Sequence, residues 1–308
     1  MQAIFTVTPV FILIGLGYVL QQKKRLSPQT LKENSFFLYW FAIPATLLNG
    51  ILSADISAVR DASFFAAVWS PFVIMLVTVW MTSRRKEDHG RFAALMLCSI
   101  RGNNFYTGIP IISLAMGKRG VEAGTLILAF TLVAMQLLSI GGAQLALFGS
   151  FSWRTVKSTC LQLLKNPLFL SCILGLFLVA TGLNSLPSWM KATLAVLSDV
   201  STGLALIMLG AGICLQNIFK TVASVWRIVL FKLAVFPAVT YVIYTCLGLS
   251  PDMVQAGVLL AGMPVAVNTV IIAKEMGMDS GHCAMGIAVT VLLSLLTLPF
   301  MIHLLGLA

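Results

Sequence analysis

Long apolar blocks separated by short polar stretches dominate the chain from one end to the other. A helix needs about 20 mostly apolar residues to cross a hydrocarbon layer of roughly 30 Å. Ten blocks approach this length, so the pattern predicts an all-α polytopic membrane protein with about ten transmembrane helices. The predicted spans are 3–21, 35–52, 63–82, 92–115, 122–149, 167–183, 190–214, 223–248, 253–275 and 283–305.

The composition agrees with this pattern and excludes a soluble domain. Of the 308 residues, 59% are hydrophobic and 10% are charged, whereas about a quarter of a soluble domain is charged. The first apolar block is followed, not preceded, by Lys23, Lys24 and Arg25. A secretory signal peptide has its positive charges before the apolar run, so we interpret the first block as a permanent span.

The net charge of +10 would suggest nucleic acid as the partner of a soluble protein, but its distribution indicates membrane topology instead. Most basic residues lie in every second connection, and short loops rich in Lys and Arg stay in the cytoplasm. We therefore expect a bilayer and no nucleic acid as partner, a bacterial inner-membrane location, and both termini outside. The fifteen of 20 basic residues assigned to the cytoplasmic side are Lys23, Lys24, Arg25, Lys32, Arg84, Arg85, Lys86, Arg91, Arg154, Lys157, Lys165, Lys220, Arg227, Lys232 and Lys274.

A polar stretch at 151–166 divides the chain into two halves, 1–150 and 151–308, with five predicted spans each. An odd number of spans in each half forces the halves into opposite orientations. This is the inverted-repeat organisation that is common among secondary transporters.

The fourth and ninth spans carry helix-breaking residues at corresponding positions. Proline and glycine interrupt a helix, and the backbone groups that they free cannot face lipid. A pair of such interruptions in register is typical of a transporter binding site, where two broken helices cross. The residues are Gly102, Asn103, Asn104, Gly108 and Pro110 in the fourth span, and Gly262, Pro264 and Asn268 in the ninth.

These breaks define the candidate substrate-binding residues. The amides of Asn103, Asn104 and Asn268 can donate and accept hydrogen bonds, either to a substrate or to freed backbone groups. The second half of a broken helix begins with unpaired N–H groups that favour an anion such as a carboxylate. Arg101, about ten residues into the fourth span, would suit bidentate carboxylate binding, or it would tie freed carbonyls or extend toward the cytoplasm.

Asp199 in the seventh span is the candidate ion-coupling residue, because an intramembrane acid can carry a proton or a sodium ion. Pairing with a neighbouring polar side chain is the structural alternative. The histidines and cysteines are scattered without metal-type spacing, and the chain lacks the H-E-x-x-H and G-x-S-x-G motifs. We therefore expect neither an enzyme nor a resident cofactor or metal.

The broken segments resemble those of the auxin efflux carrier family, which includes plant PIN proteins and bacterial carriers linked to malonate. The resemblance covers essentially the whole chain, and its specific parts are N-N-F-Y-T-G-I-P at 103–110 and M-P-V-A-V-N at 263–268. It implies that Tyr106 and Pro110 contribute to the site together with Asn103 and Pro264. Arg101 is a departure from the family pattern that makes an auxin-like substrate less certain.

The resemblance further implies a scaffold of spans 1, 2, 6 and 7 and a mobile transport domain of spans 3–5 and 8–10. Elevator-like movement of that domain would carry a small organic anion, a mono- or dicarboxylate, across the membrane. It also implies a homodimer formed through the scaffold. A sodium-coupled symporter of the bile acid carrier type is the alternative, although Asp199 lies outside the crossing.

Overall fold

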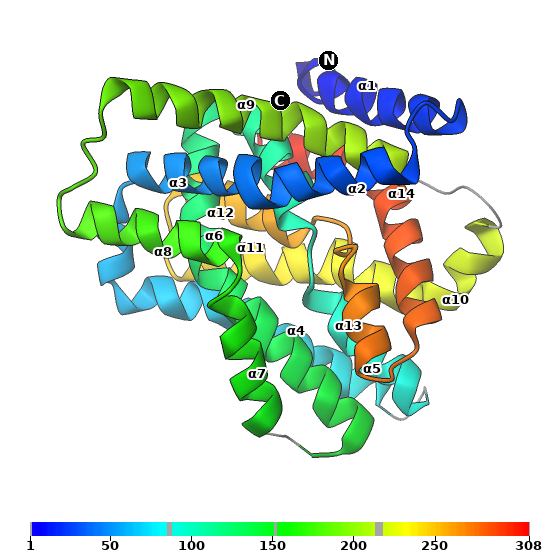
Figure 1. The fold of residues 1–308 in the computed structure, drawn as a ribbon. Helices are drawn as coiled ribbons and strands as arrows, with labels where there is room; N and C mark the ends of the chain where they lie inside the picture. Colours follow the sequence, from blue (N-terminus) through cyan, green and yellow to red (C-terminus); the bar gives the residue numbers. More distant parts are fainter. Residues whose placement is uncertain (1, 85–87, 151–152, 213–217, 308) are drawn as a thin grey trace.

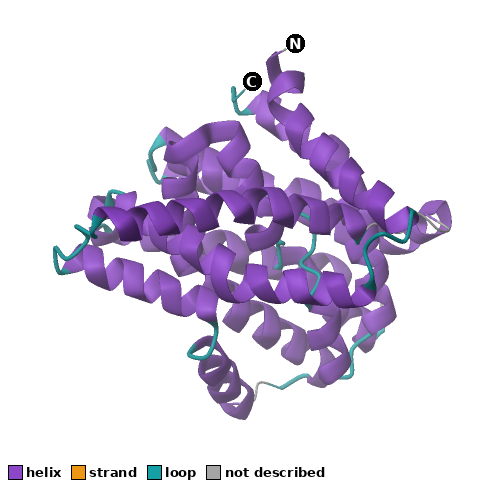
Figure 2. Ribbon diagram, turned by 45° about the horizontal axis from the view of Figure 1, so that its top comes forward, coloured by secondary structure: helices purple, strands orange, loops and turns teal. Residues whose placement is uncertain are grey.

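The computed structural model describes residues 2–84, 88–150, 153–212 and 218–307, and its regular elements are all helices (Figures 1 and 2). The first half contains α1 (Gln2–Gln22), α2 (Pro28–Phe37), η1 (Leu38–Ala42), α3 (Ile43–Ser53), η2 (Ile56–Arg60), α4 (Ala62–Ser83), α5 (His89–Ile100), η3 (Asn104–Gly108) and α6 (Ile109–Phe148). The second half contains α7 (Trp153–Leu163), α8 (Pro167–Ala180), α9 (Ser188–Ala211), α10 (Ile218–Leu230), η4 (Phe231–Val235), α11 (Phe236–Cys246), α12 (Pro251–Ala261), α13 (Thr269–Glu275) and α14 (Ser280–Leu304).

Each of the ten apolar blocks contains helix, with a break inside the fourth and the ninth, but fewer elements meet the length and apolarity that a membrane span requires. Among the described residues six helical stretches do so, and α7 with α8 would make a seventh if that pair, bent by 68°, is one span. The protein is thus an all-helical, multi-pass membrane protein. The six stretches are Pro28–Ser53, Ala62–Ser83, Asn104–Phe148, Ser188–Ala211, Val222–Cys246 and Ser280–Leu304.

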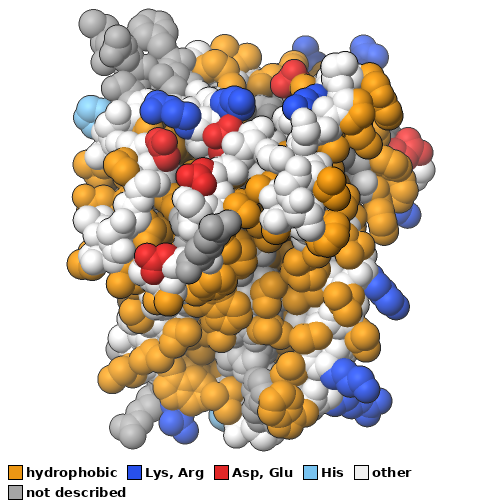
Figure 3. All heavy atoms as spheres, turned by 90° about the vertical axis from the view of Figure 1, so that its left-hand side faces the viewer, with side chains coloured by type: hydrophobic (Ala, Val, Ile, Leu, Met, Phe, Trp, Pro, Cys, Tyr) orange, Lys and Arg blue, Asp and Glu red, His pale blue; other side chains and the backbone are white. Residues whose placement is uncertain are grey.

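The outer surface is apolar, as a lipid-facing surface must be. Large hydrophobic side chains are exposed on many helices, including Val73, Phe177, Val196 and Leu296. Hydrophobic side chains cover much of the face shown in Figure 3, while acidic ones gather in its upper part. A water-soluble monomer rarely exposes continuous apolar patches of this extent.

Three short π-helical segments occur among the described residues, and each is followed by a proline. The segments η1 and η4 lie within continuous helices, whereas η3 begins the helix that continues as α6. Pro44, Pro110 and Pro237 occupy the second position after η1, η3 and η4. A proline cannot donate a backbone hydrogen bond, and its ring crowds the carbonyl of the preceding turn. The widened π turn accommodates that ring, and such turns are frequent at functional sites.

Two groups of helices pack closely, and they also contact each other, since α3 and α9 of the first set pack against α6 of the second. In the first set, α1 packs against α9, and α3 packs against both α8 and α9. The other set joins α5 to α6, α11 to α12, and α4 to α6 and α11. In Figure 1, α9 runs along α2 and α3 in the upper part of the molecule, and the two chain ends lie close together in Figures 1 and 2.

The long helix α6 is two helices in succession. Gly117 has φ +64°, a left-handed conformation that side-chain-bearing residues rarely adopt. The chain turns there, so that the part of α6 before Gly117 continues the π segment η3 and the part after it is a separate helix. The predicted boundary between the fourth and fifth blocks, at 115–122, includes this position.

Candidate functional site

The two predicted helix breaks lie side by side and are joined by backbone hydrogen bonds. α5 ends at Ile100 and α12 ends at Ala261. The residues that follow leave the helical path and form an antiparallel bridge between Gly102 and Val265. Asn103 N–H donates to the Pro264 carbonyl at 2.8 Å, and Ala266 N–H donates to the Arg101 carbonyl at 3.0 Å. We call residues 101–103 and 262–268 together the crossing.

The amino acids at the crossing suit this pairing. Pro264 has no N–H, and its carbonyl is the group that enters the bridge. A side chain at Gly102 would lie 3.3 Å from the Leu260 carbonyl oxygen and would collide with the amide of Asn104. Thr290 of α14 accepts a hydrogen bond from Val265 N–H at 3.1 Å and holds the second segment in place. The pairing thus satisfies backbone groups that would otherwise be unpaired in the membrane.

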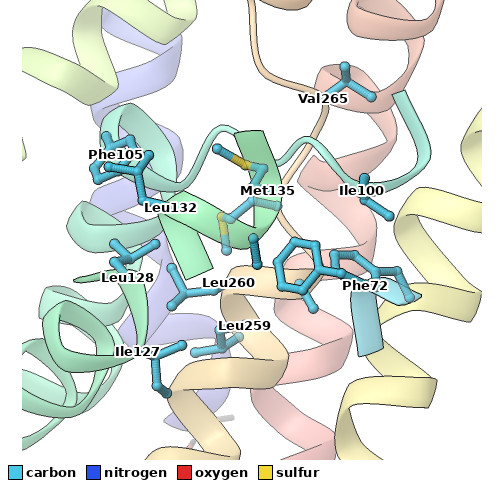
Figure 4. Close-up of a cluster of buried hydrophobic side chains, with 14 of the residues drawn as sticks. Phe72, Ile100, Phe105, Ile127, Leu128, Leu132, Met135, Leu259, Leu260 and Val265 are labelled. Carbon is cyan, nitrogen blue, oxygen red and sulfur yellow. The ribbon is translucent and has the colours of Figure 1, made fainter. Parts of the chain in front are cut away.

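Hydrophobic side chains from several helices surround the crossing. Figure 4 shows Phe72, Leu132, Leu260 and Val265 among them, and all four are buried. This apolar surrounding lowers the local dielectric, so any charge or unpaired polar atom at the crossing interacts strongly with its neighbours.

A narrow pocket lies on one side of the crossing and contains Asn104. It is a small space between α4, α6, α11 and α12, about large enough for one water molecule. Asn104 Oδ1 is buried and has no hydrogen-bond donor, and hydroxyl-bearing Thr131, Thr240 and Tyr244 also line the space. We call it the Asn104 pocket. A buried carboxamide oxygen without a donor is uncommon and marks a place where a polar ligand or water gains a hydrogen bond.

A second pocket lies between the two sets of helices and contains Thr107. It is about large enough for one water molecule, and its lining includes Ile14 of α1, Leu209 of α9, and Ser294 and Leu298 of α14. The Thr107 hydroxyl is buried without a partner. We call this space the Thr107 pocket. Sequence reasoning missed Thr107, although it lies inside the N-N-F-Y-T-G-I-P segment.

The other predicted site residues are distributed around the crossing. Asn103 is buried, and its carbonyl accepts hydrogen bonds from two N–H groups of η3. Pro110 is buried and Tyr106 is half-buried. Asn268 is exposed and directly precedes α13. Of the predicted amides, only that of Asn104 is in the lining of either pocket.

Arg101 is fully buried directly after the last residue of α5 and lines neither pocket. Its Nη1 donates to Gln136 Oε1 at 2.5 Å and to Ser139 Oγ at 3.0 Å, both in the second part of α6. Its Nε is buried without an acceptor. Two of the alternatives for Arg101 were that its guanidinium binds the freed carbonyls or extends toward the cytoplasm. Its hydrogen bonds show neither arrangement. It links the crossing to α6.

Lys232 was assigned to a cytoplasmic connection by the charge pattern, and this assignment is wrong. The residue lies in η4, in the middle of the stretch Val222–Cys246, and is fully buried. Its Nζ donates to the carbonyl oxygen of Ala261 and lies 4.9 Å from the ring centroid of Phe236. Its position, ten residues into an apolar block, was the signal that could have identified Lys232 as a buried residue within a span.

Asp199 lies near the middle of α9 on an exposed face. It is therefore within a membrane-spanning helix, as predicted. No carboxylate lines the Asn104 pocket or the Thr107 pocket among the described residues. Asp199 and the crossing are thus separate features of the molecule.

An all-helical membrane protein with two interrupted helices paired in its interior has the form of a membrane transporter, not of an enzyme. Comparison with known proteins leads to the same class. Residues 2–302 match the family described as membrane transport protein, and the chain belongs to this family, which includes the auxin efflux carriers. The resemblance drawn from the broken segments is thereby confirmed.

Individual relatives are distant but extend over most of the chain. A protein of Rhizobium meliloti (strain 1021) named "Putative malonate transporter" is 24% identical over 97% of this chain and 94% of its own. An uncharacterized transporter of Methanothermobacter thermautotrophicus is also 24% identical, over 96% of this chain and 95% of its own. Auxin efflux carrier component 5 of Arabidopsis thaliana is 28% identical over 83% of each chain.

Proposed function

We propose that the protein is a secondary transporter that moves a small organic anion, a mono- or dicarboxylate, across a bacterial inner membrane. The paired helix breaks are the observation that carries this proposal. They bring the amide of Asn104, buried hydroxyls and the start of the helix η3–α6 together in the interior of a membrane protein. The N–H groups at the start of a helix favour an anion.

The charges near the crossing support an anion over a cation. Arg101 and Lys232 are both fully buried beside it. Two buried cations without a lining carboxylate favour a negatively charged ligand, because charges interact strongly in a low-dielectric interior. The relative named for malonate, a dicarboxylate, is consistent with this substrate class.

The proposed topology has ten spans in two inverted halves, 1–150 and 151–308, with both termini outside. The fourth span is α5, η3 and the part of α6 before Gly117, and the ninth is α12 with α13. Each is interrupted at the crossing, which explains why neither meets the length of an uninterrupted span. The remaining spans are α1, α2–η1–α3, α4, the part of α6 after Gly117, α8, α9, α10–η4–α11 and α14.

The proposed mechanism is elevator-like alternating access. The packing of α1 and α3 on α8 and α9 supports a scaffold made of spans 1, 2, 6 and 7, and a homodimer would form through it. The crossing belongs to the other set, which would move as the transport domain. The Thr107 pocket lies where the two sets meet, so movement of one set would change its access to either side.

Ligand-induced thermal stabilisation of the purified protein tests the substrate class. A ligand that binds only the folded state at one hundred times its Kd adds about 2.7 kcal/mol to the free energy of unfolding. We expect mono- or dicarboxylates to raise the apparent Tm and their neutral amide analogues to leave it unchanged. Stabilisation by neutral or cationic compounds alone would contradict the proposal.

Two near-isosteric variants distinguish the pockets. Asn104→Leu removes the unpaired oxygen of one pocket, and Thr107→Val removes the unpaired hydroxyl of the other. Neither breaks a hydrogen bond of its own side chain, so both variants should fold. The variant that abolishes stabilisation by the carboxylate identifies the substrate pocket, and Asn184→Ala, at an exposed position between α8 and α9, is the control. A carboxylate response that survives in both variants would place the site elsewhere.

A further inference from the structure

Lys232 is a buried lysine whose amine is held by a helix end. Its side chain is fully buried, and its Nζ donates a hydrogen bond to the carbonyl oxygen of Ala261. The ring of Phe236 lies beneath the same nitrogen, at 4.9 Å. A charged side chain inside a membrane protein is costly unless it is paired, and such residues generally mark ion or substrate pathways.

The acceptor of this hydrogen bond is the last residue of α12. The final carbonyls of a helix have no helical N–H partner and carry a partial negative charge. Gly262 N–H donates to Val258 O at 2.9 Å, and Met263 N–H donates to Leu260 O at 3.3 Å. The Lys232 amine supplies the donor for Ala261. The positive charge thus lies at the negative end of an interrupted helix, directly beside the crossing.

In transporters built from broken helices, this type of position binds the coupling ion. Unwound backbone carbonyls and the C-terminal ends of half-helices coordinate Na⁺ or take up a proton. Oxygen atoms suited to a hard cation are present here, because Asn104 Oδ1 is buried without a donor and shares a pocket with Leu260 and Ala261. The carboxylate that would neutralise a bound sodium ion is absent from that lining.

We propose that Lys232 is a tethered cation that replaces a sodium ion at the end of α12, so that the crossing assembles and works without sodium. The proposal rests on the proposed function, because it assigns the coupling chemistry of the same crossing. The proposal goes beyond the proposed function because it excludes, for this chain, the alternative of a sodium-coupled symporter of the bile acid carrier type. It also assigns Lys232 a positioning role: the amine holds Ala261 and does not contact the substrate.

The test compares the purified wild-type protein with Lys232→Met and Lys232→Arg in sodium chloride and in choline chloride of equal concentration. Lys232→Met keeps the length of the side chain and removes the charge, whereas Lys232→Arg keeps the charge. Lys274→Met, at an exposed lysine of α13, is the matched control. The apparent Tm is measured without substrate, so the result is independent of which anion the protein carries.

We expect the wild type, Lys232→Arg and Lys274→Met to have the same Tm in both salts. Lys232→Met should lose about 5 °C or more in choline and recover in sodium, because the vacated carbonyl can then bind the ion. Methylammonium, a small free cation, should restore it as well. A merely structural lysine would give a loss that no salt reverses.

Three outcomes would overturn the proposal. The first is a wild type that sodium stabilises over choline, and the second is a Lys232→Met variant as stable as wild type in choline. The third is a loss in Lys232→Met that is equal in sodium, choline and methylammonium. If Lys232→Met does not fold in any of these salts, it counts as this third outcome. The proposed carboxylate specificity is decided separately by the ligand screen.

Discussion

Two glycines bring α1 and α9 into unusually close contact, and replacing them is the sharpest structural test of the packing. A Cβ added to Gly17 would lie 2.8 Å from the carbonyl carbon of Ile207 and 3.1 Å from the nitrogen of Ala211. A Cβ added to Gly210 would lie 2.7 Å from the carbonyl carbon of Ile14. Both obstacles are backbone atoms, so no side chain can rotate away. Small residues at such contacts let membrane helices approach closely.

The magnitude follows from these distances. Ordinary van der Waals contact of a Cβ begins at 3.4 Å, and the carbonyl oxygens of Ile207 and Ile14 lie nearer still than their carbons, so either alanine must push the two helices apart by well over 0.6 Å. Inserting a methyl group into a well-packed interior costs about 1–3 kcal/mol. With rigid backbone on the other side, we expect Gly17→Ala and Gly210→Ala each to lie in the upper half of that range. At roughly 2–4 °C per kcal/mol, this is a fall in apparent Tm of about 5–10 °C.

The same helices supply matched controls. Gly15 on α1 and Gly203 on α9 have open space where a Cβ would be. Alanine is the better helix former by about 0.8–1 kcal/mol, so Gly15→Ala and Gly203→Ala should leave the Tm unchanged or raise it. The double variant Gly17→Ala/Gly210→Ala should lose less than the sum of the two single losses, because one separation of the helices relieves both clashes.

Thermal unfolding in one detergent, followed by tryptophan fluorescence, measures all five variants under the same conditions. If Gly17→Ala and Gly210→Ala unfold at the same temperature as their controls, the close contact between α1 and α9 does not exist as described. Additive losses in the double variant would mean that the two clashes are relieved independently. Either result would refute the reasoning about a shared helix separation.

Three further predictions concern the interior. Arg101→Gln should lower the Tm, because the hydrogen bonds to α6 are lost, and should weaken carboxylate affinity about tenfold through the loss of a buried charge; an unchanged Kd in the ligand screen would leave Arg101 a purely structural residue. Asp199→Asn should alter the pH dependence of transport in liposomes while changing stability by less than about 0.5 kcal/mol, and identical pH profiles would eliminate Asp199 as a coupling residue. Gly257→Ala would place a methyl group 2.9 Å from a ring carbon of Tyr244, so it should cost about 1–3 kcal/mol in thermal unfolding and displace the ring that lines the Asn104 pocket; wild-type stability would contradict the described contact.

Local chemistry made the helices and their interruptions predictable. Each apolar block is helical, because a backbone inside a membrane must satisfy its own hydrogen bonds. The breaks at 101–103 and 262–268 were predicted because Gly102, Gly262 and Pro264 weaken a helix wherever they occur. The length of the uninterrupted stretches was less predictable, since the fourth and ninth blocks are each divided by the crossing.

The contacts of the buried cations could not be derived from sequence, because they join residues far apart in the chain. Arg101 binds Gln136, 35 positions later, and Lys232 binds Ala261, 29 positions later. The charge pattern also misassigned Lys232, because counting basic residues by connection assumes that each one lies at a helix end. A buried lysine in the middle of a span violates that assumption.

The contacts of the two cations bear on how the protein can release its substrate. Lys232 reaches the end of α12 from a neighbouring helix, whereas the guanidinium of Arg101, the residue after α5, donates to Gln136 and Ser139 of α6. The charge of Lys232 is therefore partly balanced by a helix end, and that of Arg101 by polar side chains, before any anion arrives. A carrier must release on one side of the membrane what it binds on the other, and an unbalanced pair of buried cations would hold a dicarboxylate too tightly for that. Cations that already stabilise the fold leave the helix start at η3 and the unpaired hydroxyl of Thr107 to provide a weaker, reversible attraction.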